Sequence, residues 1–249
     1  MINVAVVGLY VDTIADGFRL HAWQEPQIIT FQKQIEQINL APFIKEAFHE
    51  EQVSAMRILQ TAMSQFEIHR VPNATLWQKI KNLRPPNIVR GFMYFNIFNA
   101  VKLGQGIVES IDPSQKVVFP KKMAETQREM DAMGHLHIWQ AYKLLAAIAV
   151  PNGTKALQTF AYNQTKVDEA QIVCALERFH LKRGNYPEAL NELLPQFLAT
   201  LPHDIIGGQP LKYDRTDDGQ FVLYSIGWNE TDNGGEFDSI YDRGDWVWQ

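Results

Sequence analysis

The residues best suited to chemistry lie in a polar loop near the C-terminus, from Trp228 to Gly244. Around the glycine pair Gly234-Gly235, this loop carries seven carboxylate or amide side chains: Asn229, Glu230, Asp232, Asn233, Glu236, Asp238 and Asp242. Oxygen ligands of this kind suit a hard divalent cation such as calcium. The loop has little apolar surface to bury, and ordering it costs roughly 1–2 kcal/mol of backbone entropy per residue. A bound cation would offset that cost.

The predicted calcium site takes five side chains as ligands: Asn229, Asp232, Asp238, Asp242 and Asp245. The carbonyl oxygen of Ile226 is a further donor in this hypothesis. The spacing of the acids is not that of an EF-hand, in which acids at the first, third and fifth positions are followed by a glutamate at the twelfth. The alternative interpretation is an acidic loop in solvent that binds no metal. No other cofactor is predicted.

Two histidine-containing motifs fall short of a zinc site. The run His49-Glu50-Glu51-Gln52-Val53 has valine where the zinc-protease helix needs its second histidine. In His135-Leu136-His137 the two imidazoles are two positions apart, so on a helix they point to different sides. The seven histidines have no cysteine partner in a zinc-ligand pattern, so zinc is not predicted.

Two other patterns are weak signals for catalysis or phosphate binding. Tyr224-Ser225-Ile226-Gly227 lacks the leading glycine of a nucleophile elbow, so Ser225 is predicted to be an ordinary strand residue. Gly104-Gln105-Gly106 falls inside or at the end of a predicted helix and does not follow a strand, so it is not a phosphate loop. We expect this glycine pair to kink or end the helix.

Composition and charge narrow the class of protein. A chain of 249 residues allows one large domain or two smaller ones, and 46% hydrophobic residues support a substantial core. The formal net charge is −5 and no basic run occurs, so a nucleic-acid partner is not expected. The single cysteine, Cys174, rules out a disulfide framework within the chain and is compatible with any compartment.

Apolar residues at helical spacing predict a mainly α-helical chain up to about residue 182. Helices are expected near 3–20, 28–38, 42–66, 88–107, 123–150 and 154–182. In the fourth of these, the aromatic residues follow helical spacing, which is typical of a core, with a ligand cavity as the alternative: Phe92, Tyr94, Phe95 and Phe98. In the fifth, Leu136, Trp139, Leu144 and Ile148 are expected to face inward.

The pattern changes after Gly184, which caps the last long helix. Tyr186-Pro187 opens a short predicted helix over 188–194, and a turn-rich stretch follows. Residues 211–213 and 221–225 read as two strands joined by the hairpin signal Asp217-Asp218-Gly219. The predicted fold is therefore mainly α with a small C-terminal α+β domain, a long helix plus a short antiparallel sheet. The predicted domains are 1–160, helical, and 161–249, α+β.

The C-terminal third resembles the globular domain of the type II secretion major pseudopilins. Ala175-Leu176-Glu177-Arg178-Phe179 with Gly184-Asn185-Tyr186-Pro187 is similar to the end of their long helix and the turn after it. Leu201-Pro202-His203-Asp204 with Gly208, Pro210 and Tyr213 is similar to their next segment. The last strands and the acidic Gly-Gly loop, with Asp245 and Trp248, are similar to their calcium loop. The resemblance covers roughly residues 165–249.

The chain also departs from that family. Ile205-Ile206 replaces a Pro-aromatic pair, Asn229 stands where an aspartate is frequent, and the loop is longer. The chain shows neither a prepilin-peptidase signature nor an N-terminal membrane helix, so fibre formation does not carry over from the resemblance. What the resemblance implies is a pseudopilin-like module after a helical domain, as in uncharacterised bacterial envelope proteins with such a C-terminal module. An extracytoplasmic location and a calcium ion in the loop are implied with it.

The favoured function is a non-catalytic structural or protein-interaction module, calcium-stabilised and related to secretion, with an unknown protein partner. One alternative is a hydrolase-like enzyme in the helical domain, whose only acid and base groups are scattered ones such as His49, Glu50 and Glu51. Another is a binder of small molecules or peptides. Because residues 2–11 are apolar without a signal-peptide pattern, we also expect Met1 to open a fragment of a longer chain, with membrane attachment through a segment not present here. The alternative is a genuine short start.

Overall fold

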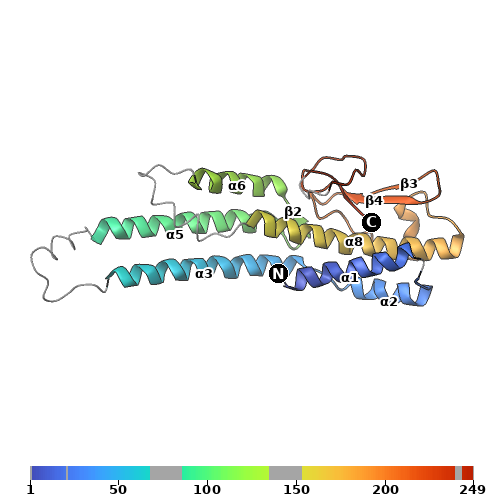
Figure 1. The fold of residues 1–249 in the computed structure, drawn as a ribbon, viewed down its shortest axis with the longest axis horizontal. Helices are drawn as coiled ribbons and strands as arrows, with labels where there is room; N and C mark the ends of the chain where they lie inside the picture. The colour runs from blue at the N-terminus through green and yellow to red at the C-terminus, as the bar shows by residue number, and fades with distance from the viewer. Residues whose placement is uncertain (1, 21, 68–85, 135–152, 239–242, 249) are drawn as a thin grey trace, which may run out of the picture. The chain divides into compact units, whose positions relative to one another are not determined.

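The computed structural model describes residues 2–20, 22–67, 86–134, 153–238 and 243–248, and within these it is mainly helical (Figure 1). The described α-helices are α1 (Ile2–Arg19), α2 (Glu25–Ile35), α3 (Ala41–Glu67), α5 (Pro86–Glu109), α6 (Pro120–Gly134) and α8 (Gly153–Arg183). The described strands are β1 (Ile111–Asp112), β2 (Val117–Val118), β3 (Lys212–Arg215), β4 (Phe221–Ser225) and β5 (Trp246–Val247). The expectation of a mainly helical chain with a small C-terminal antiparallel sheet is confirmed. No helix in the described ranges combines the length and the apolar character needed to cross a membrane.

The chain forms two compact units. Unit 1 combines residues 1–44, 111–120 and 155–249, and unit 2 combines residues 45–110 and 121–154. The N-terminal helices thus belong with the C-terminal sheet, because they pack on α8 in a common core. The predicted domain boundary near residue 160 is based on the change of sequence pattern, and it stays a prediction.

Helix α8 is the centre of unit 1. Its residues from Val167 to Leu176 are buried almost without interruption, which requires neighbours on all sides. In Figure 1, α1 and α2 run along one side of α8 and the sheet β3-β4-β5 lies on the other. Lys166 of α8 pairs with Asp12 of α1, and the ring of Tyr162 meets that of Trp246 in β5 at 5.5 Å between centroids. The core joins α1, α2, α8 and β4 through apolar side chains, among them Ile14, Phe18, Ile28, Ile35, Phe179 and Leu223.

The C-terminal sheet is antiparallel, in the order β3-β4-β5. Lys212 pairs with Tyr224 and Arg215 with Phe221, so the register of the hairpin places the predicted turn between the strands. In that turn, Gly219 has φ of +81°, a conformation that glycine adopts without a steric penalty. Six apolar or aromatic residues around this sheet are buried in the core or partly buried against it: Phe179, Tyr186, Leu190, Leu194, Leu198 and Tyr213.

The end of α8 is set by local chemistry. The backbone N–H of Gly184 donates to the carbonyl of His180 at 2.8 Å, which satisfies one of the last carbonyls of the helix. Lys182 and Arg183 in the final turn face the negative end of the helix dipole. After this corner, the predicted short helix over 188–194 is a single 3₁₀ turn at Leu190–Leu193.

Helix α5, in unit 2, continues past its glycine pair to Glu109, so the expected end there is wrong, and the alternative of a kink stays a prediction. A Cβ on Gly106 would lie 2.3 Å from Oγ1 of Thr126, so this glycine lets α6 approach α5 closely. Lys102 on α5 also forms an ion pair with Glu129 on α6, at 2.8 Å. Gln52 on α3 donates to the carbonyl of Val101 at 3.0 Å.

The aromatic residues of α5 do not form the expected core. Tyr94 and Phe98 are 62% and 63% exposed, and Phe95 is 44% exposed. The buried side of the helix is instead Asn96, Asn99, Ala100, Leu103 and Ile107. Helical spacing fits both faces, so packing decides which one is buried. Phe92 and the expected inward residues of the fifth helix, Leu136, Trp139, Leu144 and Ile148, lie outside the described residues.

Candidate functional site

The predicted metal loop begins and ends at one place, where β4 and β5 pair. Ser225 is opposite Trp246 in that pair, so the loop leaves and returns at neighbouring positions. Gly227 has φ of +68°, and a Cβ at this position would lie 2.3 Å from the carbonyl oxygen of Gly244. Only glycine permits this approach, so the two ends of the loop are drawn together by the backbone itself.

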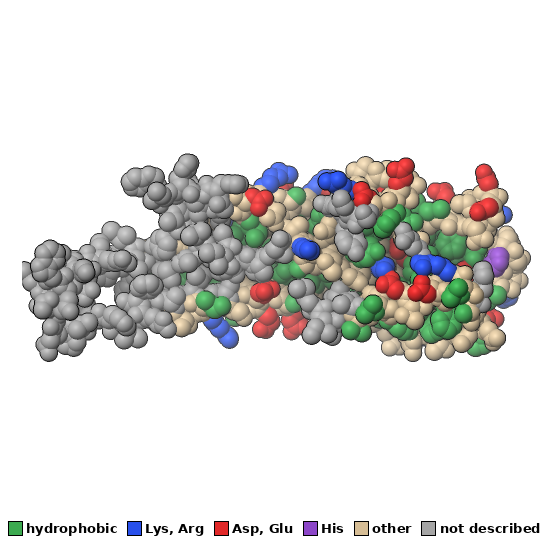
Figure 2. Space-filling view, in the orientation of Figure 1, with side chains coloured by type: hydrophobic (Ala, Val, Ile, Leu, Met, Phe, Trp, Pro, Cys, Tyr) green, Lys and Arg blue, Asp and Glu red, His purple; other side chains and the backbone are tan. Residues whose placement is uncertain are grey.

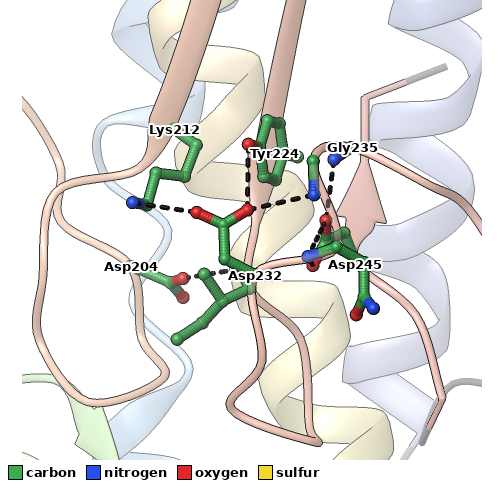
Figure 3. A network of polar contacts seen from close by, with 9 residues as sticks. Asp204, Lys212, Tyr224, Asp232, Gly235 and Asp245 are labelled. Carbon is green, nitrogen blue, oxygen red and sulfur yellow. Dashed lines mark hydrogen bonds and ion pairs between the residues drawn. The ribbon is translucent and has the colours of Figure 1, made fainter.

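Asp245 binds the loop from its inner side through backbone hydrogen bonds. The residue is fully buried, and its carboxylate accepts the backbone N–H of Gly235 at 2.7 Å and that of Asn233 at 3.0 Å (Figure 3). Its own backbone N–H donates to the carbonyl of Glu236 at 3.1 Å. A charged acceptor with two backbone donors makes strong hydrogen bonds. Asp245 therefore fixes the Gly234-Gly235 turn against the start of β5.

Asp232 lies on the outer side of the same turn. One of its oxygens accepts the backbone N–H of Gly234 and the hydroxyl of Tyr224, each at 3.1 Å. The other lies 3.1 Å from the ammonium of Lys212, as Figure 3 shows. Backbone hydrogen bonding from Gly234, followed by the bond with Lys212, lowers the pKa of Asp232.

The other predicted ligands are placed differently. The amide oxygen of Asn229 accepts the backbone N–H of Thr231 at 2.9 Å, and its amide nitrogen donates to the carbonyl of Arg243 at 2.8 Å. Asn229 thus ties the two arms of the loop. Asp238 is partly buried. Asp242 lies outside the described residues.

The donor chemistry of the loop fits calcium, since Asp232 and Asp245 are placed on either side of one glycine turn. Burial raises the pKa of Asp245, and the carboxylates of Asp232 and Glu236 raise it further, against the backbone bonds from Gly235 and Asn233. A cation would relieve this repulsion. Among the residues that the structure describes, no three Asp, Glu, His or Cys side chains gather as a metal-binding group. Oxygens of Asp232 and Asp245 already accept from donors of the chain.

Asp204, a residue of the second pseudopilin-like motif, is an anchor between two segments. Its carboxylate accepts the hydroxyl of Ser225 at 2.8 Å and the backbone N–H groups of Ile206 at 2.9 Å and Ile226 at 3.1 Å. Ser225 is fully buried at the end of β4, so it is a strand residue as predicted. Burial raises the pKa of Asp204 to about 6, although these three hydrogen bonds lower it.

Two further carboxylates are buried on α8, and the sequence reasoning missed them. Asp168 and Glu169 are 6% and 2% exposed. Asp168 accepts one hydrogen bond, from Gln164 at 3.1 Å, and Oε1 of Glu169 has no hydrogen-bond partner. Burial raises the pKa of Asp168 to about 7, and the charge of Asp204 adds to the effect, while Gln164 and Lys116 oppose it. Burial also raises the pKa of Glu169 well above its usual value, with Asp204 and Asp168 contributing.

A signal for these carboxylates exists in the sequence. Apart from Gln171, the residues after Val167-Asp168-Glu169-Ala170 are apolar up to Leu176, so a pair of adjacent acids stands at the start of a helix segment buried on every side. A buried acid is costly unless it is paired or protonated, so such a pair is informative. The histidine motif at 49–53 differs, because His49, Glu50 and Glu51 are exposed on α3. His135 and His137 lie outside the described residues.

The chain matches no protein-family model, and neither a curated protein nor a solved structure matches it. On the face shown in Figure 2, the basic side chains of the described part are interspersed with acidic ones and do not gather into a patch.

Proposed function

We propose that this chain is a non-catalytic structural or protein-interaction module that works outside the cytoplasm in a role related to secretion. The observation that carries the interaction is the exposed aromatic face of α5, which consists of Tyr94, Phe95 and Phe98. The rings of Phe95 and Phe98 lie 6.3 Å apart, so they form one apolar surface. Large exposed aromatic side chains that cluster are typical of protein–protein contacts, in which tyrosine and phenylalanine are enriched.

The resemblance to type II secretion pseudopilins supports the location and the secretion role. The order of elements agrees with it: a long helix, a Tyr-Pro corner, an antiparallel hairpin and an acidic loop before the last strand. Asp204 and the buried pair Ile205-Ile206 anchor the segment that departs from the family pattern. The pseudopilin-like character of this module is part of the proposal.

The proposal includes calcium as a stabilising ion of the C-terminal loop. Asp232 and Asp245 would hold it, together with Asn229, Asp238 and Asp242. The supporting observation is that burial, and after it the charges of Asp232 and Glu236, raise the pKa of Asp245. Outside the cytoplasm calcium is plentiful, so the proposed location and the proposed ion are consistent with each other.

Size-exclusion chromatography of a gentle extract from the native cells tests the interaction. We expect the tagged chain to elute in a complex larger than the free chain, and the double variant Tyr94→Ser, Phe98→Ser to elute as the free chain. A matched control is Lys33→Ser with Asp217→Ser, two exposed positions outside α5. Elution of the wild-type chain as a free monomer in every extract would contradict the proposal. The location is tested by adding a protease to cells whose outer barrier has been opened and measuring whether the chain is cleaved.

A further inference from the structure

A pocket of about 750 Å³ opens in unit 1 between three segments of the chain. One wall is the β1–β2 hairpin within 114–119, the second is α8, and the third is the segment 200–209. Its volume lies in the range of small-molecule sites, which is roughly 300–1,000 Å³. It is separate from the acidic loop and from the aromatic face of α5.

Two walls of this pocket, the β1–β2 hairpin and the segment 200–209, are fixed to one another. The backbone N–H of Val118 donates to the carbonyl of Ile205 at 2.8 Å, and the N–H of Gly207 donates to the carbonyl of Val118 at 3.3 Å. At the rim, Nε2 of His203 lies 2.8 Å from the carbonyl oxygen of Gln115. Ile205, Val118 and Ile206 are buried behind these bonds. The pocket is therefore formed before any ligand arrives, which reduces the entropy cost of binding.

Two buried polar side chains of α8, Asp168 and Gln171, line the pocket. Asp168 has one hydrogen bond, from Gln164, so acceptor capacity of its carboxylate is left over. Gln171 is 9% exposed, and its amide can both donate and accept a hydrogen bond. Buried polar groups are nearly always paired, so a carboxylate with acceptor capacity left over in the wall of a pocket points to a polar ligand.

Above the pKa of Asp168, which is about 7, the pocket offers one charge of each sign. Asp168 supplies the carboxylate, and Lys116, in the hairpin wall, supplies an ammonium group. The charge of Lys116 favours the ionised form of Asp168. A positive group beside Asp168 and a negative group beside Lys116 would satisfy both.

We propose that this pocket binds a small zwitterion of the amino-acid class, with its ammonium group on Asp168 and its carboxylate on Lys116. Gln171 provides an amide that both donates to and accepts from the ligand. Binding requires no chemical step. The proposal does not depend on the interaction surface of α5 or on calcium.

Isothermal titration calorimetry tests this site with the twenty free amino acids and the dipeptide Gly-Gly, each in turn. Ethylamine, which lacks a carboxylate, and propionate, which lacks an amine, are the single-charge probes. We expect at least one zwitterion to bind and both single-charge probes to bind about tenfold or more weakly, because each loses one charge-assisted contact. No heat from any zwitterion, or equal affinity for a single-charge probe, would overturn the proposal.

The variants Asp168→Asn and Lys116→Gln should each weaken binding of the active zwitterion by about tenfold or more. Matched controls are Asp217→Asn in the β3–β4 turn and Lys33→Gln on α2, both exposed and outside the pocket lining. The control variants should bind as the wild type does. Because Lys116 is not buried, Lys116→Gln is expected to fold even if the α8 variant does not. Unchanged affinity in Lys116→Gln would show that the ligand lies elsewhere.

Discussion

The carboxylate of Asp204 accepts the hydroxyl of Ser225 at 2.8 Å, which links the segment before β3 to the end of β4. Burial raises the pKa of Asp168 and Glu169 on α8, and the charge of Asp204 raises both further, because like charges in a low-dielectric interior repel one another. Three carboxylates in one part of unit 1 make its stability depend on protonation. Of the three, Asp168 lines the pocket proposed to bind a zwitterion.

The first prediction concerns pH. Asp168 has its pKa raised from 3.8 to about 7, so the folded state holds a proton that the unfolded state releases near pH 4. The stabilising contribution of this group is therefore full below about pH 4 and is lost as the pH rises through about 7. We expect the free energy of unfolding of the wild type, minus that of Asp168→Asn, to fall by roughly 2–4 kcal/mol over this window.

Urea unfolding at pH 4, 5, 6 and 7 measures this difference. The same difference for Asp217→Asn, an exposed acid in the hairpin turn, should stay constant over the window. A constant difference for Asp168→Asn as well would mean that Asp168 is not protonated in the folded chain at pH 5.

The second prediction concerns Asp245. Replacing it with alanine removes the acceptor for the backbone N–H groups of Asn233 and Gly235, so we expect a loss of about 2 kcal/mol in the free energy of unfolding. Asp245→Asn keeps one oxygen acceptor and should lose less. Chemical denaturation measures both values, with Asp217→Ala as the exposed control. If Asp245→Ala and the control were equally stable, Asp245 would not be the residue that closes the loop.

The third prediction concerns calcium. We expect millimolar calcium to raise the melting temperature and a chelator to lower it, with magnesium much less effective because it demands tighter octahedral geometry. A dissociation constant one hundredth of the calcium concentration would stabilise the fold by about 2.7 kcal/mol. The difference should vanish in Asp245→Ala.

Replacing Lys212 gives a second and more specific test of calcium binding. Its ammonium pairs with Asp232 at 3.1 Å, so it competes with a cation for that carboxylate. In Lys212→Gln we expect a larger calcium effect than in the wild type, whereas Lys33→Gln should respond as the wild type does. If calcium and chelator give superimposable melting curves in the wild type and in Lys212→Gln, the loop is an acidic connection without a metal.

The fourth prediction concerns the corner after α8. The hydroxyl of Tyr186 donates to Glu177 at 2.7 Å, and its ring stacks on His180 at 4.5 Å between centroids. Tyr186→Phe should cost about 1 kcal/mol, and Tyr186→Ala about 3–5 kcal/mol, because the alanine variant also leaves a cavity. Thermal unfolding measures both, with exposed Tyr94→Phe as the control. If both Tyr186→Ala and Pro187→Ala left the melting temperature unchanged, this corner would not be structural.

Much of the fold followed from local sequence signals. The predicted helix over 154–182 is α8, since no proline interrupts it and Gly184 ends it. The hairpin followed from Asp217-Asp218-Gly219, because this turn and its flanking strands are close in sequence. The choice of buried face on α5 did not follow. Its aromatic residues and the face with Asn96 and Leu103 have the same helical period, and only long-range packing distinguishes them.

The candidate site was predictable only in part. The acidic residues and the glycines of the loop were visible in the sequence, and Asp232 and Asp245 do lie around the Gly234-Gly235 turn. The pairing of Asp232 with Lys212 was not visible, because it depends on the register of the sheet. The proximity of Asp204 to the buried carboxylates of α8 was not visible either, because Asp204 is distant from them in the chain.

The central claim, that α5 presents a protein-interaction surface, is tested most directly by photo-crosslinking in the native cells. A photoreactive phenylalanine replaces Phe98 in one variant and Lys33, an exposed position on α2, in another. We expect a discrete crosslinked product with one envelope protein from position 98, and none from position 33. The absence of any product at position 98, or the same products at both positions, would contradict the claim.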